Sequence, residues 1–146
     1  VASINPETVK KLKNDIRINE VKPNKLFSTN CDVISPCALG GAINKSNKNS
    51  LSCKAIVGAA NNQLDNSETG KWLLKNKIIY SPDYLVNSGG VIAIASEINN
   101  TELTLEKQLG EIGNRLKVVL EKSIKNNEST ELVAKDIAWE RIKSSS

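Results

Sequence analysis

Three short apolar runs constrain the fold of this chain more than any other feature. They occupy residues 31–35 (CDVIS), 54–58 (KAIVG) and 78–80 (IIY), and small residues or proline follow each run. Consecutive apolar positions, as in 54–58, are typical of strands that are buried on both faces. A segment with helical character, residues 67–75, separates the second run from the third. This alternation predicts βα units and a parallel sheet.

Further elements are expected on both sides of these runs. Asn5 and Pro6 have the chemistry of a helix start, since asparagine is a good N-cap and proline suits the first turn. The other predicted elements are strands at 1–4 and 16–21, a single turn at 23–26, a glycine-containing turn into a helix at 37–43, a buried helix at 88–98, and helices at 103–125 and 130–142. The pattern therefore changes near residue 87, from βα units to helices alone.

Composition argues against two classes of partner. The 20 Lys and Arg residues include only Arg17, Arg115 and Arg141 as arginines, although arginine is the residue expected where phosphates or base edges are held bidentately. Aromatic residues make up 3% of the chain, too few to stack nucleic-acid bases. The longest strongly apolar stretch, residues 91–95, is far shorter than the roughly 20 residues of a membrane span. We therefore expect no nucleic-acid or membrane partner, and a cytoplasmic location.

The absence of histidine and the spacing of the cysteines narrow the chemistry further. A chain without His has no histidine base and no histidine metal ligand. Cys31, Cys37 and Cys53 form no C-x-x-C pair, and their odd number, without a secretory signal, argues for free thiols. Zinc would require four ligands at closer spacing, so no metal site is expected. The chain also lacks Met and opens on an apolar segment, so we expect it to be a piece of a longer protein.

The residues that follow the predicted strands indicate where a ligand would bind. Ligands of parallel α/β sheets bind beyond the carboxyl ends of the strands. In this chain those ends carry Ser3 and the segments 35–38, 58–62 and 81–90. These positions hold small, amide or glycine residues with no charged pair among them, which favours a molecule that is approached by the backbone. The pattern indicates a cofactor cleft.

Three segments in register resemble one protein family. CDVISPCALGGAIN (31–44), KAIVGAANNQL (54–64) and IIYSPDYLVNSGGVI (78–92) closely resemble the cofactor domain of amino-acid dehydrogenases. The match is to the leucine/valine/phenylalanine branch of the glutamate dehydrogenase superfamily. Order and spacing agree across all three segments, and the flanking helices agree more loosely. The resemblance therefore extends over the chain from residue 1 to residue 142.

This resemblance implies a fold and a reaction. The fold is α/β, a Rossmann-like doubly wound and mostly parallel sheet that lacks its first strand, followed by C-terminal helices. Residues 1–146 would form a partial dinucleotide-binding domain, with βα units over 1–86 and helices over 87–143, and the substrate domain would lie outside this chain. The reaction is the NAD(P)-dependent oxidative deamination of a branched-chain or aromatic L-amino acid to a 2-oxo acid and ammonium. Members of the family are usually homo-oligomers.

Most of the candidate site residues follow from the same resemblance. Pro36, Cys37 and Ala38 resemble the turn whose backbone lies along the nicotinamide side of the cofactor. Asn61 and Asn62 resemble the amide pair between the nicotinamide ribose and the substrate. An amide offers a donor and an acceptor without charge, which suits neutral sugar hydroxyls. Asn62 is also expected to contact the substrate.

Two further positions complete the candidate cofactor site. Asn87 resembles the residue that pairs with the nicotinamide carboxamide, although its side chain could instead cap the helix that begins near Gly89. Ser3 falls where the family places an acidic residue on the adenosine ribose. NAD is the cofactor that the resemblance implies. A serine can bind a ribose hydroxyl but does not repel a 2′-phosphate, so NADP stays open.

The sequence also departs from the family pattern. The glycine-rich phosphate loop G-x-G-x-x-G is absent, and none of the lysines lies in a motif that matches the family's substrate-binding or catalytic lysine. No catalytic residue is therefore assigned, and the chain alone is expected to be inactive. The alternative to part of an enzyme is a non-catalytic relic or partner module of the same fold.

Overall fold

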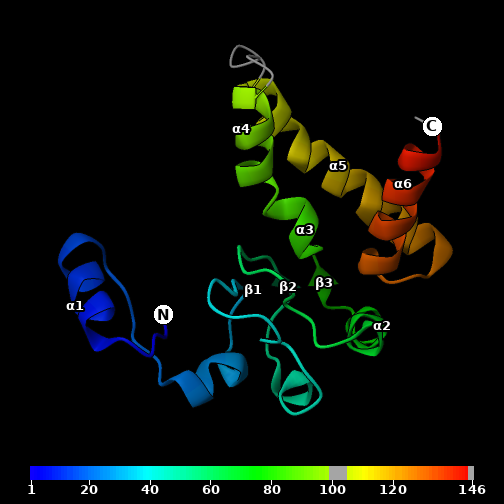
Figure 1. Cartoon of the computed structure of the whole chain (residues 1–146). Helices are drawn as coiled ribbons and strands as arrows, with labels where there is room; N and C mark the ends of the chain where they lie inside the picture. Colours follow the sequence, from blue (N-terminus) through cyan, green and yellow to red (C-terminus); the bar gives the residue numbers. More distant parts are fainter. Residues whose placement is uncertain (99–104, 145–146) are drawn as a thin grey trace.

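The computed structural model describes residues 1–98 and 105–144, and its centre is a parallel three-stranded sheet (Figure 1). The strands are β1 (Val33–Ile34), β2 (Ala55–Ile56) and β3 (Ile79–Tyr80), in the order β1-β2-β3. Val33 pairs with Ala55, which in turn pairs with Ile79. Each strand lies inside one of the three apolar runs, so the predicted α/β class with a parallel sheet is confirmed.

Helix α2 (Ser67–Lys75) connects β2 to β3 and has the bounds that the sequence predicts. Asn66 caps the helix, because its side-chain oxygen accepts a hydrogen bond from the Thr69 N–H at 3.1 Å. Leu73 of α2 is completely buried in the main core cluster, where it packs with Ile56 and Tyr80 of the sheet. The helix is therefore fixed at its start by a local hydrogen bond and along its length by apolar packing.

The connection from β1 to β2 contains no α-helix, so the helix predicted at 37–43 is wrong. Gly41 has a φ of 68°, in the left-handed region that interrupts a helix. Ile43 forms an isolated bridge with Leu64, and its N–H donates to the Gln63 carbonyl at 2.9 Å. Tertiary hydrogen bonds thus replace the helical ones, and the only helical turn of this connection is the 3-10 helix η2 (Lys48–Ser50).

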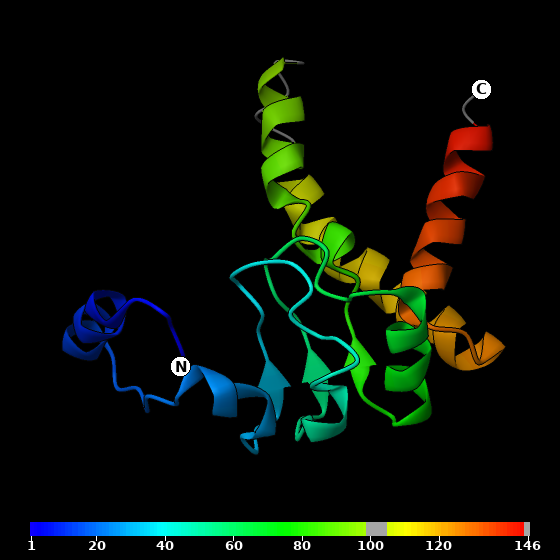
Figure 2. The ribbon, with the colours of Figure 1, turned by 60° about the horizontal axis from the view of Figure 1, so that its bottom comes forward.

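The strands predicted at 1–4 and 16–21 are also wrong, although the helix between them, α1 (Pro6–Asp15), is confirmed with Asn5 as its cap. The two segments meet through two hydrogen bonds, from Val21 N to Val1 O at 2.8 Å and from the Val1 amino group to Asn19 O at 2.6 Å. Ile4 is 93% exposed, so burial does not stabilise a strand there. The predicted turn at 23–26 is the 3-10 helix η1 (Pro23–Ser28), and this whole N-terminal part lies beyond the β1 edge of the sheet (Figure 2).

The two faces of the sheet are buried to different extents. One face carries Ile34 and Ile56, both almost completely buried. The other face carries Val33, Val57 and Ile79, which are 52%, 37% and 51% exposed. Among the described residues, apolar burial therefore stabilises the sheet mainly through the face that carries Ile34 and Ile56.

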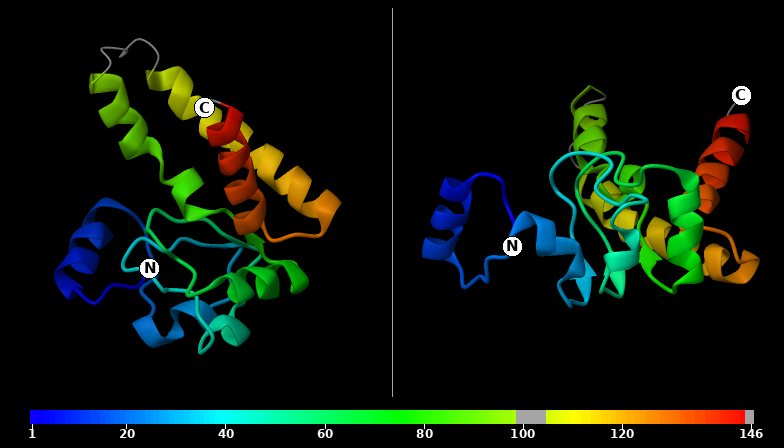
Figure 3. Two further views of the ribbon diagram at one scale, coloured as in Figure 1. Left: turned by 45° about the vertical axis from the view of Figure 1, so that its right-hand side comes forward. Right: turned by 90° about the horizontal axis from the view of Figure 1, so that it is seen from below.

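The C-terminal half consists of α3 (Asp83–Val86), α4 (Gly89–Ile98), α5 (Leu105–Asn126) and α6 (Thr130–Ser144). Helices α4 and α5 run antiparallel and project from the sheet, and α6 packs along α5 (Figure 3). A second apolar cluster joins Val119 of α5 to Val133 and Ala134 of α6. The first residues of the helix predicted at 103–125 lie outside the described residues.

Helix α4 exists as predicted, but the expectation that it is buried is wrong. Val91, Ile94 and Ile98 are 72%, 59% and 76% exposed, and Ser96 is the buried residue of this helix. The apolar composition of α4 was misleading because, among the described elements, this helix packs mainly against α5.

The N-terminus of α6 is fastened to the end of β3. Thr130 Oγ1 donates to the Tyr80 carbonyl at 2.7 Å, and Tyr84 Oη donates to the Glu131 carbonyl at 2.8 Å. The Glu131 side chain reaches toward Gly70 of α2, and its buried Oε2 has no hydrogen-bond partner among the described residues. Burial, and then the nearby Asp83 carboxylate, raise the pKa of Glu131, with a smaller opposing contribution from Lys135.

Substituting Gly58 tests how closely β1 and β2 approach at their carboxyl ends. A Cβ at Gly58 would overlap the carbonyl oxygen and the ring of Pro36. We expect Gly58→Ala to lower the free energy of unfolding by about 2–4 kcal/mol, measured by urea denaturation. The control is Gly113→Ala in α5, where a Cβ meets nothing and the better helix propensity should add up to about 1 kcal/mol. Equal midpoints for the two variants would contradict this packing.

The raised pKa of Glu131 predicts a pH-dependent stability. Because the folded-state pKa lies above the unfolded one, the charged form opposes folding, and stability is lost as pH rises through the two values. We expect Glu131→Gln to raise the urea midpoint at pH 7, with the gain disappearing on acidification to about pH 4. Glu140→Gln, at an exposed position of α6, controls for the loss of one negative charge. A gain that is the same at both pH values would rule out this origin.

Candidate functional site

Three loops meet at the carboxyl edge of the sheet, where the sequence places a ligand. They are residues 35–42 after β1, 57–62 after β2 and 81–88 after β3, and the third of them includes the short helix α3 (Figure 2). The Ala60 N–H donates to the Pro36 carbonyl at 3.0 Å, and the Gly41 N–H donates to the Asn62 carbonyl at 2.7 Å. The first two loops are therefore bonded to each other by their backbones.

Gln63, which sequence reasoning did not single out, holds the second loop in shape. Its side chain is completely buried, and Nε2 donates to the Gly58 carbonyl at 2.7 Å and to the Ala60 carbonyl at 2.9 Å. A buried carbonyl group without a hydrogen-bond donor destabilises the fold, and this loop has no neighbouring strand to donate to its carbonyls. The Gln63 side chain supplies the missing donors. Its place directly after the Asn61–Asn62 pair was the available signal.

Asp83, also missed from the sequence, connects the second loop to the third. Oδ2 accepts from the Gln63 N–H at 2.7 Å and from Tyr80 Oη at 3.3 Å, and Oδ1 accepts from the Tyr84 N–H at 2.6 Å. Burial, followed by the Asp83 charge, raises the pKa of Tyr80. Burial, Glu131 and Asp83 together raise the pKa of Tyr84 to about 12, so both phenols are neutral at physiological pH. Asp83 is thus a structural anchor that is turned away from solvent.

The structure brings two of the predicted amides into contact. Asn87 Nδ2 donates to Asn61 Oδ1 at 2.5 Å, across 26 positions of sequence. Asn87 is the C-cap of α3. At the start of α4, the backbone carbonyl of Ser88, and not Asn87, accepts a hydrogen bond from the Ile92 N–H. The contact with Asn61 therefore replaces the helix-capping role that the sequence left open for Asn87.

Asn62 is exposed beside this pair and is held in an unusual conformation. Its φ is 52°, a left-handed value that asparagine tolerates better than most residues. Gly40 lies close to this backbone, because a Cβ there would come within 3.0 Å of the Asn61 carbonyl oxygen. The turn thereby presents the Asn61 and Asn62 side chains to solvent.

Pro36, Cys37 and Ala38 lie where the sequence predicts, at the end of β1. Pro36 is buried, and the other two residues are exposed. The Cys37 thiol lies 3.4 Å from Ser35 Oγ, and this contact, with a hydrogen bond from the Ala59 backbone, lowers the pKa of Cys37 against a small opposing effect of burial. Cys37 is therefore an exposed thiol at this edge whose pKa is lowered by its hydrogen bonds.

Ser3 is not brought together with the other candidates. It lies in the N-terminal segment, and its Oγ accepts from the Asn5 N–H at 3.1 Å. Within the described residues it forms no hydrogen bond to the three loops.

Comparison with known proteins identifies the family of this chain. The family model for Glutamate/Leucine/Phenylalanine/Valine dehydrogenase matches residues 3–137. The chain belongs to this dehydrogenase family. The resemblance inferred from the three segments at 31–44, 54–64 and 78–92 is therefore confirmed.

Individual relatives in the family agree over almost the entire chain. A leucine dehydrogenase of Bacillus subtilis is 40% identical over 144 residues, which are 97% of this chain and 39% of that protein. An L-tryptophan dehydrogenase of Nostoc punctiforme is 35% identical over 147 residues, 99% of this chain and 42% of that protein. The chain thus spans about two fifths of the length of these dehydrogenases.

Solved structures of the family have the same fold. The crystal structure of the Nostoc punctiforme L-tryptophan dehydrogenase superposes with a TM-score of 0.93, at 33% identity, over 99% of this chain and 44% of that one. A hetero-hexameric glutamate dehydrogenase from Thermus thermophilus, 20% identical, superposes with a TM-score of 0.71 over 97% of this chain and 36% of that one.

None of the helices described in this chain is long and apolar enough to cross a membrane.

Replacing Gln63 tests its role at the edge of the dehydrogenase sheet. We expect Gln63→Leu to lower the free energy of unfolding by about 2 kcal/mol, because two buried carbonyl groups lose their donors while one unpartnered side-chain oxygen is also removed. The measurement is urea denaturation followed by circular dichroism.

An exposed amide provides the control for this variant. Asn114 lies on the exposed side of α5, and Asn114→Leu should change stability by no more than about 0.5 kcal/mol. A Gln63→Leu midpoint equal to that of the native chain would show that the loop keeps its shape without the glutamine.

Proposed function

We propose that this chain is the cofactor-binding part of an amino-acid dehydrogenase that catalyses the NAD(P)-dependent oxidative deamination of an L-amino acid to a 2-oxo acid and ammonium. The contact that supports the proposal best is the amide pair of Asn61 and Asn87 at the carboxyl edge of the sheet. Amide side chains that meet beside exposed loops can bind a neutral carboxamide and neutral sugar hydroxyls. Residues 1–146 would then form a partial dinucleotide-binding domain.

The residues at this edge fit the uncharged carboxamide and ribose hydroxyls at the nicotinamide end of such a cofactor. The loops at 35–42, 57–62 and 81–88 contain one ionisable acid, Asp83, and it is buried in hydrogen bonds to the protein. The remaining side chains are amides, hydroxyls, one thiol and apolar groups, and the amides and hydroxyls can hydrogen-bond to an uncharged carboxamide or sugar hydroxyl. The donor set therefore matches a carboxamide and a ribose rather than a phosphate.

Each residue of the site would have a limited task. The backbone at Pro36, Cys37 and Ala38 would lie along the cofactor, and Asn61 and Asn87 would orient its carboxamide and ribose. Asn62 would reach both cofactor and substrate. When bound, the nicotinamide supplies the hydride chemistry at the substrate α-carbon. No residue of this chain is proposed to transfer a proton.

The preferred cofactor in this proposal is NAD. Ser3 is the residue proposed for the adenosine ribose, and its hydroxyl carries no charge that would repel a 2′-phosphate, so NADP is the second candidate. The substrates proposed are branched-chain or aromatic amino acids, since the relatives include leucine, phenylalanine and L-tryptophan dehydrogenases.

A fusion protein tests this function directly. Residues 1–146 would replace the matching part of the Bacillus subtilis leucine dehydrogenase, whose other residues would be kept in place. We expect the fusion to reduce NAD with leucine, phenylalanine or tryptophan, while the 146-residue chain alone does not. Asn87→Ala should lower kcat/KM by about 5- to 30-fold, because about 1–2 kcal/mol of hydrogen bonding to the cofactor is lost.

Two comparisons make the result decisive. Asn114→Ala removes an exposed amide on α5, away from the three loops, and should leave kcat/KM within twofold of the unmodified fusion, about 0.4 kcal/mol. A fusion that folds and assembles like the leucine dehydrogenase but shows no amino-acid-dependent reduction of NAD would refute the proposal and leave a non-catalytic partner of the same fold.

A further inference from the structure

Asp83 links the two segments that carry the amide pair of Asn61 and Asn87. Its Oδ2 accepts a hydrogen bond at 2.7 Å from the N–H of Gln63, the residue that follows Asn62. Its backbone carbonyl accepts a hydrogen bond at 2.8 Å from the N–H of Asn87. One residue therefore connects the backbone beside the first amide to the backbone of the second.

Burial protects the Asp83 carboxylate from exchange with water. Asp83 is 8% exposed, and Gln63 is completely buried. The other carboxylate oxygen, Oδ1, accepts from the Tyr84 N–H at 2.6 Å, and Oδ2 also accepts from Tyr80 Oη at 3.3 Å. Both oxygens therefore act as acceptors, and hydrogen bonds to a charged acceptor are stronger than those between neutral groups.

The contact between the two amides is weaker than this link. Asn87 Nδ2 reaches Asn61 Oδ1 through side chains alone, at an exposed position. An exposed hydrogen bond between neutral groups exchanges readily with water and contributes little net stability. The separation of Asn61 and Asn87 is therefore set by the buried carboxylate rather than by their own contact.

We propose that Asp83 is a positioning residue for the cofactor, whose carboxylate holds Asn61 and Asn87 at the separation at which they orient the carboxamide and the ribose. This inference rests on the proposed function and adds to it a residue that acts through the amides. A neutral amide at position 83 cannot replace the carboxylate. Its single oxygen would accept from the N–H of Gln63 or of Tyr84, and its NH₂ group would face the other N–H.

Equilibrium binding of NADH to the fusion protein tests this inference without relying on catalysis. We expect Asp83→Asn to raise the Kd for NADH about tenfold, because one buried N–H loses its acceptor and the amides move apart. In a fusion that already carries Asn87→Ala, the same change should raise the Kd by less than about twofold, since the amide through which Asp83 acts is gone. The Kd is measured from the fluorescence of bound NADH, and circular dichroism shows that each variant is folded.

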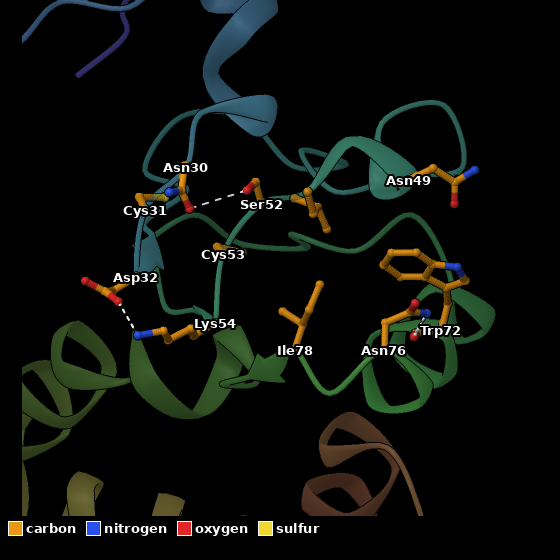
Figure 4. Close-up of a pocket in the computed structure, with 11 residues that line it drawn as sticks. Asn30, Cys31, Asp32, Asn49, Ser52, Cys53, Lys54, Trp72, Asn76 and Ile78 are labelled. Atoms are coloured by element: carbon orange, nitrogen blue, oxygen red, sulfur yellow. Dashed lines mark hydrogen bonds and ion pairs between the residues drawn. The ribbon is translucent and has the colours of Figure 1, made fainter.

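Asp32 provides the matched control. It lines a cavity of about 690 Å³ at the amino ends of the strands, at the edge opposite the three loops (Figure 4). Its side chain is 78% exposed and forms an ion pair with Lys54 at 2.7 Å. Asp32→Asn makes the same chemical change as Asp83→Asn, and it should leave the Kd for NADH unchanged within about 1.5-fold.

A milder variant keeps the inference testable if Asp83→Asn does not fold. Tyr80→Phe removes only the hydroxyl that donates to Oδ2, and it should raise the Kd for NADH about threefold. Thr130→Val removes a hydroxyl that donates to the Tyr80 carbonyl and does not contact Asp83, so it should leave the Kd unchanged.

The outcomes separate this inference from the proposed function. A fusion that does not bind NADH before any substitution would overturn the proposed function and this inference with it. If the unmodified fusion binds NADH, an unchanged Kd in Asp83→Asn, or in Tyr80→Phe where it takes its place, would overturn this inference alone. The same fold-change with and without Asn87→Ala would also overturn it, because Asp83 would then act independently of the amide.

Discussion

The carboxyl edge of the sheet depends on the hydrogen bonds of Gln63. Short parallel strands of two residues leave most of their backbone groups to be satisfied by the loops that follow. Gln63 donates twice to the loop after β2, its N–H reaches Asp83 after β3, and its carbonyl accepts from Ile43 in the connection after β1. One residue thus ties together three segments that the strands alone would leave apart.

The C-terminal helices extend this edge and do not enclose the sheet. Hydrogen bonds from Thr130 and Tyr84 join the start of α6 to the end of β3 and the start of α3. Tyr84 lies in α3, and the Asn87 N–H at the end of this helix donates to the Asp83 carbonyl at 2.8 Å. The same contacts that attach α6 therefore also position the third loop. The unpartnered Oε2 of Glu131 lies at this junction, and its raised pKa is the cost of packing α6 so closely against α2.

Local chemistry could be predicted from the sequence, and long-range contacts could not. Consecutive apolar residues, the N-cap Asn5 and the helical character of residues 67–75 are local signals, so the three strands, α1 and α2 were located correctly. The strands predicted at 1–4 and 16–21 failed because a strand also needs a neighbour that buries it. The carboxyl-end rule for parallel sheets brought Asn61 and Asn87 to one edge, but the roles of Gln63 and Asp83 arise from a hydrogen bond across 20 positions, which no local pattern encodes.

The 2.5 Å contact between Asn61 and Asn87 has a consequence for selectivity. Each amide already has a partner, so an incoming molecule gains nothing by offering a single hydrogen bond in exchange for the one it breaks. A guest that offers both a donor and an acceptor leaves no group unpaired, whereas a carboxylate in the same place could satisfy only the N–H groups. In the proposed cofactor site, the closed pair would therefore favour an amide over an acid of the same shape.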